Sequence, residues 1–262
     1  MAFILTFFVF QAFERYSVSA HNQSLSFACV ATAQGIDATR INPAALVLLR
    51  KNSIGVGYEY TFAHIEGLQN LFLGFARPLF HGGFGIGISQ FGFEEQKEQA
   101  LTTAYSLGLS RDFFIGASAD LYLIQNKRMG TGISCGLNLG MLGILSKRWY
   151  LGANGHNLNE PEFSNTSEGR LPPSLQAGIG YKPFDDMVSE IDISLSNDDI
   201  RIHTAGAFQI MDFFDLRTGF QTNPISVSFG FGIIHKFIKI DYGCEYLVDL
   251  PLNHIVSVNF EF

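Results

Sequence analysis

Ser194, Asp192 and His203 are residue types that form the catalytic triad of many hydrolases. They fall in two neighbouring segments that alternate apolar and polar residues, so two paired strands would bring the three side chains close together. The sequence holds neither G-x-S-x-G nor H-E-x-x-H, the spacings typical of nucleophilic serines and zinc ligands. On the inner face of a closed sheet, most such groups serve as hydrogen-bond partners. We therefore predict a protein without enzymatic activity, metal or cofactor.

Charged residues are sparse and occur singly. They make up 16% of the 262 residues and give a net charge of −7. Because phosphate binding needs a concentrated positive field, nucleic acid is excluded as a partner. Single charges recur on the more polar face of the alternating segments, and we expect this face to line a lumen. There we expect the charges to form structural ion pairs; the alternative is a ring that selects ions. They are Asp120, Asp192, Arg201, Arg217, Lys239, Asp241 and Glu245.

Alternation with a period of two runs from Asn52 to the C-terminus and indicates β-strands. Fourteen segments are recognisable, with about twelve or thirteen as the alternative count. No helix-period segment interrupts them, so residues 52–262 predict an all-β fold, a transmembrane antiparallel up-and-down β-barrel. The segments are centred near residues 56, 73, 87, 105, 118, 137, 152, 177, 192, 205, 217, 229, 240 and 257.

The connections between these segments alternate in character, as expected of a barrel with periplasmic turns at one end and external loops at the other. A soluble β-sandwich is the alternative, but its outer face would carry many Lys, Glu and Thr residues. Here Gly, Ser, Ala and Asn dominate the second face, and the apolar face would meet lipid, where the sheet must close. The tight connections are residues 81–83, 111–112, 146–148, 184–186, 211–212 and 235–236, and the longer ones include 93–99, 125–130 and 156–170.

The N-terminus carries a short apolar run over residues 2–13, and Val18-Ser19-Ala20 resembles the cleavage site of a secretory signal. We predict that residues 1–20 are a signal peptide, with a buried N-terminal helix as the alternative. No Lys or Arg precedes the apolar run, so the correct start of the chain is open. The three cysteines are far apart and predict no disulfide framework.

Residues 21–51 connect this signal to the first strand and contain Asn42-Pro43-Ala44. Asn is a favoured N-cap and Pro suits the first helical position, so a short apolar helix is expected up to Arg50. A helix of this length is stable only when it packs against other structure. We predict that the segment plugs the lumen, with a position under the periplasmic rim as the alternative. The plug residues are Asn42, Pro43, Ala44, Leu46, Val47 and Leu49.

Three blocks of sequence carry a family resemblance from about residue 31 to the end. They are "ATAQGIDATRINPAALVLLRKNSIGVGYEY", "GISCGLNLGMLGILSKRWYLGANGHNLNEPEF" with "LPPSLQAGIGYKP", and "IDYGCEYLVDLPLNHIVSVNFEF". They resemble the PorV/PorQ-like outer-membrane barrels within the broader FadL-like superfamily. The resemblance implies a 14-stranded barrel in the bacterial outer membrane with its N-terminal segment in the lumen.

The resemblance also implies two different roles. A PorV/PorQ-like protein would serve type IX secretion or surface attachment, with a translocon or secreted cargo as partner. A FadL-like protein would admit hydrophobic small molecules or lipids, and an early strand would kink to give a lateral exit. Gly83, Gly85 and Gly87 are the candidates for that kink, although they could equally leave room for the plug.

The chain ends in alternating aromatic residues. Phe260 and Phe262 resemble the C-terminal signal that outer-membrane assembly machinery recognises. Membrane lipids and that assembly machinery are therefore the general partners that the sequence predicts.

Overall fold

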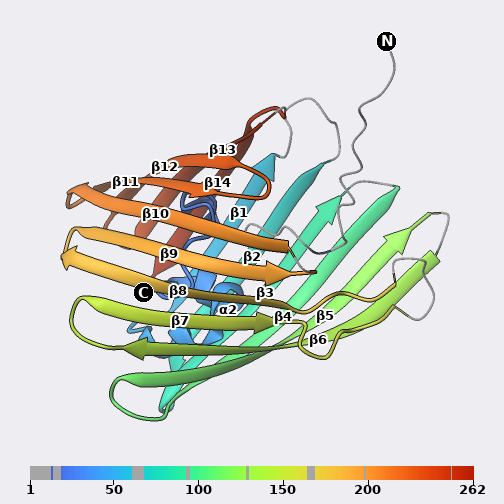
Figure 1. The fold of residues 1–262 in the computed structure, drawn as a ribbon, viewed down its shortest axis with the longest axis horizontal. Helices are drawn as coiled ribbons and strands as arrows, with labels where there is room; N and C mark the ends of the chain where they lie inside the picture. The colour runs from blue at the N-terminus through green and yellow to red at the C-terminus, as the bar shows by residue number, and fades with distance from the viewer. Residues whose placement is uncertain are drawn as a thin grey trace.

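A computed structural model describes residues 13, 19–60, 68–92, 95–127, 130–163, 169–197, 199–248 and 250–262. The chain forms a closed antiparallel barrel in which each strand pairs with its sequence neighbours and β1 pairs with β14 (Figure 1). The strands are β1 (Ser53–Tyr60), β2 (Gln69–Leu79), β3 (Gly82–Gly92), β4 (Gln96–Gly108), β5 (Phe113–Asn126), β6 (Gly130–Ile144), β7 (Trp149–His156), β8 (Ser174–Phe184), β9 (Met187–Ser196), β10 (Asp199–Met211), β11 (Phe214–Gln221), β12 (Ser226–His235), β13 (Ile238–Leu247) and β14 (Asn253–Glu261).

In the described part of the N-terminal region, four short helices precede the strands, and they lie inside the barrel (Figure 1). They are the α-helices α1 (Ala20–Ser24) and α2 (Ala38–Ile41) and the 3-10 helices η1 (Gly35–Asp37) and η2 (Pro43–Leu48). Among the described residues, no helix is both long and apolar enough to cross a bilayer. Every predicted segment centre falls within one of the 14 observed strands, which confirms the predicted barrel.

The two ends of the barrel differ as the sequence predicted. Each tight turn connects an even-numbered strand to the next odd-numbered one, from β2–β3 to β12–β13. These turns gather at one end of the barrel, at the left of Figure 1. The links expected at 93–99 and 125–130 are shorter than predicted, because β4 begins at Gln96 and β5 ends at Asn126. Side-chain amides extend the pairing there: Gln99 Nε2 donates to Gln90 Oε1 at 2.9 Å, and Asn126 Nδ2 to Gln96 Oε1 at 3.1 Å.

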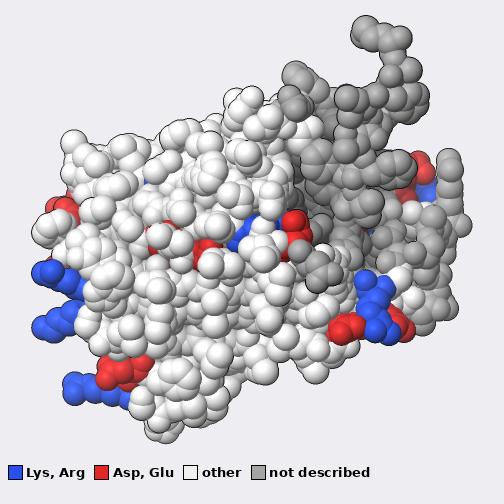
Figure 2. All heavy atoms as spheres, viewed as in Figure 1, with Lys and Arg blue, Asp and Glu red and all other residues white. Residues whose placement is uncertain are grey.

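The outer face of the wall is apolar over most of its height. Figure 2 shows Lys, Arg, Asp and Glu mainly at the two ends of the molecule, with uncharged atoms covering most of the band between them. Strands of this length suit the hydrocarbon core of a bilayer. Over most of the circumference, closure of the barrel leaves no unpaired sheet edge facing lipid. Exposed side chains on this face include Leu73, Ile88, Leu139, Met141, Ile191 and Phe229.

The barrel closes where the last strand meets the first. Ser53 lies opposite Glu261, and one step further the backbone of Asn52 and Phe262 exchanges two hydrogen bonds of 2.9 and 3.0 Å. The side chain of Phe262 is 64% exposed, so its ring adds little to the packing of the closed barrel. Phe260 pairs with Ile54 on β1 and with Ile238 on β13.

Replacing Phe260 and Phe262 together by Ser should sharply reduce the amount of assembled barrel, since the backbone closure is retained and only the aromatic recognition signal is lost. The readout is the heat-modifiable band on unheated gels of outer-membrane fractions. Phe213→Ser with Phe237→Ser is the matched control, because both rings are more than half exposed beside tight turns. Equal assembly of the two double variants would show that the terminal rings are not a signal.

Candidate functional site

The candidate site is the lumen, which residues 19–51 fill. Helix α1 packs against β11, β12, β13 and β14, and η2 packs against β2 to β6 on the opposite wall. Ser19 and Ala20, which the sequence assigned to the signal peptide, are buried with this segment; the rest of the predicted signal apart from Phe13 lies outside the described residues. We use the name plug segment for residues 19–51.

Asn42 organises the middle of the plug segment. Its side chain caps η2 by accepting a hydrogen bond from the Ala44 nitrogen at 3.1 Å, with Pro43 in the first turn as expected. The amide nitrogen of Asn42 donates to the Val30 oxygen at 2.8 Å and to the Met141 oxygen of β6 at 2.9 Å. The predicted helix is a 3-10 helix that ends at Leu48, because Leu49 is already extended with ψ of 133°.

The apolar side of η2 forms part of a lumen core. Ala44 and Leu46 are fully buried, while Val47 and Leu49 are partly buried and pack against the same cluster. Burial of a leucine side chain contributes about 1.5–3 kcal/mol. The wall residues in this cluster are Phe72, Ala76, Ala104, Phe114 and Leu142.

Glycines of the wall allow the plug backbone to approach closely. A Cβ on Gly116 would lie 2.4 Å from the Ala44 nitrogen, and a Cβ on Gly152 would lie 2.3 Å from the Val30 oxygen. Both contacts are with main chain, which cannot rotate away as a side chain can. On the other wall, a Cβ on Gly219 would lie 2.4 Å from the Leu25 carbonyl carbon. The segment therefore fits only because these wall positions lack side chains.

The glycines of β3 serve the same purpose, and the predicted kink at Gly83, Gly85 and Gly87 is absent from the described strand. β3 pairs with both neighbours without a register shift from Gly82 to Phe91. A Cβ on Gly83 would lie 2.0 Å from the Leu46 oxygen, one on Gly85 would meet Thr39, and one on Gly87 would meet the Phe72 ring. The alternative explanation, that these glycines leave room for the plug segment and the core around it, accounts for all three.

Buried acids of the wall bind backbone N–H groups of the plug segment. Asp192 accepts from the Val30 nitrogen at 3.0 Å and from Gln176 at 2.8 Å, and Glu190 accepts from the Ala31 nitrogen at 2.6 Å and from the Thr32 hydroxyl. Glu245 accepts from the Gln23 amide at 2.8 Å. Through these hydrogen bonds the three acids fasten the plug segment to β9 and β13.

Three of the remaining predicted lumen charges, Arg217, Lys239 and Asp241, join one network of ion pairs. Arg217 is buried and pairs with Asp215 and Asp241, and Lys239 Nζ lies 3.2 Å from Asp215 and 3.7 Å from Asp241. This network joins β11 and β13 on the wall that α1 packs against. Arg201 lies apart from it and pairs with Asp199 at 3.4 Å. The arrangement is that of structural ion pairs.

Ser194 and His203 do come together, as the spacing suggested. The Ser194 Oγ and His203 Nε2 atoms are 2.8 Å apart, but His203 Nδ1 faces the Ser26 carbonyl oxygen at 2.8 Å in place of a carboxylate. Asp192 instead accepts a hydrogen bond from the Val30 nitrogen. His203 thus bridges the wall and the plug segment, and the acid of a hydrolase triad is not in position.

Asp37 is a further buried acid within the plug segment itself. It accepts a hydrogen bond of 2.7 Å from the Ser19 hydroxyl, and His21 Nδ1 lies 3.7 Å away. Burial raises the pKa of Asp37 to about 7 and lowers the pKa of His21 well below its usual value. Because both groups favour their neutral forms, the lumen tolerates them without a full ion pair.

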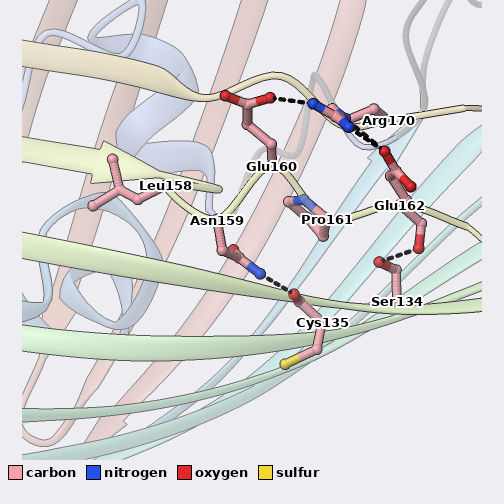
Figure 3. A pocket seen from close by; sticks show the side chains of 8 residues that line it. All are labelled: Ser134, Cys135, Leu158, Asn159, Glu160, Pro161, Glu162 and Arg170. Carbon is pink, nitrogen blue, oxygen red and sulfur yellow. Dashed lines mark hydrogen bonds and ion pairs between the residues drawn. The ribbon is translucent and has the colours of Figure 1, made fainter.

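Within the described residues, strand pairing is incomplete between β6 and β8. β7 ends at His156, so β6 pairs with it only from Leu139 to Ile144 and its first nine residues, 130–138, lack a strand neighbour on that side. The connection after β7 covers this edge. Asn159 Oδ1 accepts a hydrogen bond from the Leu137 nitrogen at 2.8 Å. Asn159 Nδ2 donates to the Cys135 oxygen, also at 2.8 Å (Figure 3). We call residues 157–163 the wall segment.

The wall segment makes further contacts with β6 and with Arg170. Ser134 Oγ donates to the Glu162 oxygen at 2.9 Å, and the exposed Arg170 bridges Glu160 and Glu162 (Figure 3). These groups surround an open depression of about 680 Å³. Exposed ion pairs contribute about 0–1 kcal/mol, so the pairs of Arg170 add little to the stability of the segment.

A second depression of about 910 Å³ lies on the outer face beside the wall segment, and Leu158 lines both. Its surface is almost entirely apolar, as a lipid-facing hollow requires. Inward-facing Asn154 and Gln176 also reach it, so the wall is thin here. The apolar lining includes Leu139, Met141, Leu175, Ile193 and Leu195.

Several residues of this site were missed from sequence. Glu190 precedes Asp192 by two residues and shares its face, so the same alternation could have found it. Asn159 sits in a polar connection among other amides, and nothing in the local pattern distinguishes it. Its role depends on the early end of β7, which the sequence did not indicate.

No protein-family profile matches the sequence. No curated protein is significantly similar to it. Solved structures share the fold: the toluene transporter TodX of Pseudomonas putida aligns with a TM-score of 0.74 at 14% identity, over 96% of this chain and all of that one. The CymD monoaromatic hydrocarbon channel gives 0.69 at 13% identity, over 94% and 97% of the two chains.

A Pseudomonas aeruginosa FadL homologue aligns with a TM-score of 0.67 at 12% identity, over 95% of this chain and 98% of that one. At such low identity the likeness establishes a shared fold.

Replacing Leu46 by Asp should release the plug segment and open the barrel, because a charge would be buried in the lumen core and barrels of this size are wider than their side chains can fill. We expect the wild type to be nearly silent in planar bilayers and the variant to conduct. Leu48→Asp is the matched control, since Leu48 lies on the same helix but is 42% exposed. Equal conductance of wild type and Leu46→Asp would contradict a lumen plug.

The close approach of wall and plug backbone can be tested separately. Gly116→Val should raise conductance, because its Cβ would overlap the Ala44 backbone, whereas Gly143→Val should not, because the nearest atom to its Cβ is Leu151 Cβ at 4.0 Å. Both barrels should assemble, as judged by heat-modifiable migration. A silent, assembled Gly116→Val barrel would mean that the segment does not depend on this contact.

Proposed function

We propose that the protein is an outer-membrane channel for hydrophobic small molecules. Molecules enter the lumen from the loop end and leave sideways through the wall segment into the membrane, without chemical conversion. The observation that carries the proposal is the incomplete wall between β6 and β8, with an apolar depression directly outside it. A buried plug segment below and an incompletely paired wall beside the lumen favour lateral release over passage through the barrel.

The similar solved structures support this role. Two of them are a toluene transporter and a monoaromatic hydrocarbon channel. The exit differs from the one expected from sequence, since β3 is regular and the incomplete strand pairing lies on the other side of β6. An apolar ligand that leaves at Leu158 would meet Leu139 and Leu175 and would not have to cross water.

The other role that the sequence left open is a PorV/PorQ-like part in protein export or surface attachment. The long connection after β7 folds back onto the barrel through Leu158 and Asn159. That arrangement serves closure of the wall better than it serves capture of a large partner. The channel is therefore the role that the geometry supports best.

Leu158→Arg should reduce uptake of radiolabelled toluene by intact cells several-fold, because it places a charge between the two depressions where an apolar ligand would pass. Leu145→Arg is the control, since Leu145 is 66% exposed in the turn at the other end of the β6–β7 hairpin. Both variants should reach the outer membrane in equal amounts.

Unchanged toluene uptake in an assembled Leu158→Arg barrel would contradict the proposed exit. Loss of toluene specificity, with equal uptake of a small sugar, would contradict a hydrophobic channel altogether. Co-purification of a large translocon in mild detergent, together with no toluene uptake by the wild type, would favour the export role.

A further inference from the structure

Trp149, the only tryptophan of the chain, stands at the turn end of β7. It lies opposite Tyr181 of β8, and the centroids of the two rings are 4.3 Å apart. The rings are on the outer face, because Gly152, three residues after Trp149, faces the plug segment. Tryptophan and tyrosine rings on the outside of a membrane barrel lie at the level of the lipid headgroups. The pair therefore marks the headgroup level at this end of the wall.

Two cations directly precede Trp149 in the β6–β7 turn. Lys147 and Arg148 are exposed, and in the described part of the chain neither side chain has an ion-pair partner. The Arg148 nitrogen donates to Ser146 Oγ at 3.2 Å, and the Arg148 oxygen accepts from the Lys182 nitrogen at 2.8 Å, so the turn backbone is held in place. Figure 2 shows Lys and Arg side chains projecting at the left end, where Figure 1 draws the β6–β7 turn. Two unpaired positive charges therefore lie beside the aromatic pair.

The charge of this turn differs from that of the other turns at the same end. Among the six tight turns, which the structure describes in full, the β6–β7 turn alone holds two Lys or Arg residues and no Asp or Glu. The β4–β5 turn holds Arg111 and Asp112, and the β8–β9 turn holds Asp185 and Asp186. An anionic group at this rim is therefore attracted to the β6–β7 turn and repelled by the β8–β9 turn. This places it on the β5 side of β7.

A track without side chains runs along the outer face of β6 on that side. Gly143 faces outward, because its neighbour Leu142 is fully buried in the lumen core. Gly143 pairs with Phe113 of β5 and with Leu151 of β7, and the nearest neighbour of a Cβ built on it would be Leu151 Cβ at 4.0 Å. Leu145, which is 66% exposed, borders the track at the turn end. The outer face is thus recessed at Gly143, between apolar side chains that suit an acyl chain.

The track reaches the outer apolar hollow of about 910 Å³, whose lining includes Met141 and Ala153. These two residues lie opposite each other on β6 and β7 and are the next outward pair after Gly143 and Leu151. Ala153 is four residues from Trp149, a distance of about 13 Å along a strand. The hydrocarbon chains of one leaflet span about 15 Å. A lipid with its headgroup at the level of Trp149 therefore has its chain ends at the hollow.

We propose that this face of the barrel binds one phospholipid with an anionic headgroup, such as phosphatidylglycerol, from the periplasmic leaflet. The headgroup binds Lys147 and Arg148. The glycerol region packs on Trp149 and Tyr181, and an acyl chain follows Gly143 to the hollow. Charge complementarity selects an anionic lipid over a zwitterionic one, because each cation near a membrane surface attracts anionic lipid. The inference goes beyond the proposed channel function, since it requires the barrel to lie in a bilayer but does not require a ligand to pass.

Because Trp149 is the only tryptophan, its fluorescence reports the lipid at this site alone. The assembled full chain is placed in phosphatidylcholine vesicles that contain a fixed fraction of brominated phosphatidylglycerol or of brominated phosphatidylcholine, with the bromines near the headgroup end of one chain. Bromine quenches tryptophan fluorescence only at short range. Quenching over a series of fractions should give phosphatidylglycerol an affinity at least about fivefold higher than that of phosphatidylcholine.

Three variants locate the site, and heat-modifiable migration verifies that each is assembled. Lys147→Gln with Arg148→Gln should abolish the preference for phosphatidylglycerol. Lys51→Gln with Lys236→Gln is the matched control and should keep it, because the same charge is removed from the same end but on the opposite side of the barrel, beside β1 and between β12 and β13. Gly143→Leu should weaken the preference with every charge in place, because the new side chain fills the track.

Equal quenching of the wild type by the two brominated lipids at every fraction would overturn the proposal, whatever the variants do. So would a preference that both double variants lose equally, since the attraction would then come from the net charge of the rim and not from a site. These outcomes are separate from failure of the channel, because toluene uptake that depends on Leu158 does not require a bound phospholipid.

Discussion

The lumen of this barrel is closed by main chain lying against main chain, and the rest of the structure follows from that constraint. Gly116 and Gly152 have no side chain where the plug segment passes, so its backbone lies directly on the wall. Buried peptide groups must find hydrogen-bond partners. Asp192, Glu190 and His203 supply them from the wall, and Asn42 supplies them from the plug. The polar and acidic side chains of the lumen thus hold the plug segment in place.

The wall is uneven around its circumference, and the proposed exit rests on this unevenness. β5 and β6 are the longest strands, while β7 stops at His156. The exposed edge of β6 is covered by Asn159, whose amide makes two of the hydrogen bonds that a neighbouring strand would make. A side chain can leave such an edge more easily than a strand can. The incomplete strand pairing and the apolar hollow outside it coincide at Leu158.

Much of the fold could be predicted from sequence because a membrane barrel repeats one simple rule. Alternation located every strand, and Asn42-Pro43 indicated a capped helix that had to pack somewhere. The β3 glycines show the limit: the sequence marks a missing side chain but does not say whether a bend or a neighbour requires it. Asn159 could not be predicted, because its role arises from contacts between distant segments. Arg217 was expected in the lumen, but its partner Asp215 was not.

Hydrogen exchange measured by mass spectrometry on the assembled, detergent-solubilised barrel tests the central claim most directly. The backbone N–H groups of Val30 and Ala31 bind buried carboxylates, so peptides from residues 19–51 should exchange as slowly as peptides from the neighbouring strands β9 and β12. Slow exchange over the whole segment is the predicted result. Exchange of residues 19–51 within seconds, while the strands stay protected, would contradict a lumen closed by this segment.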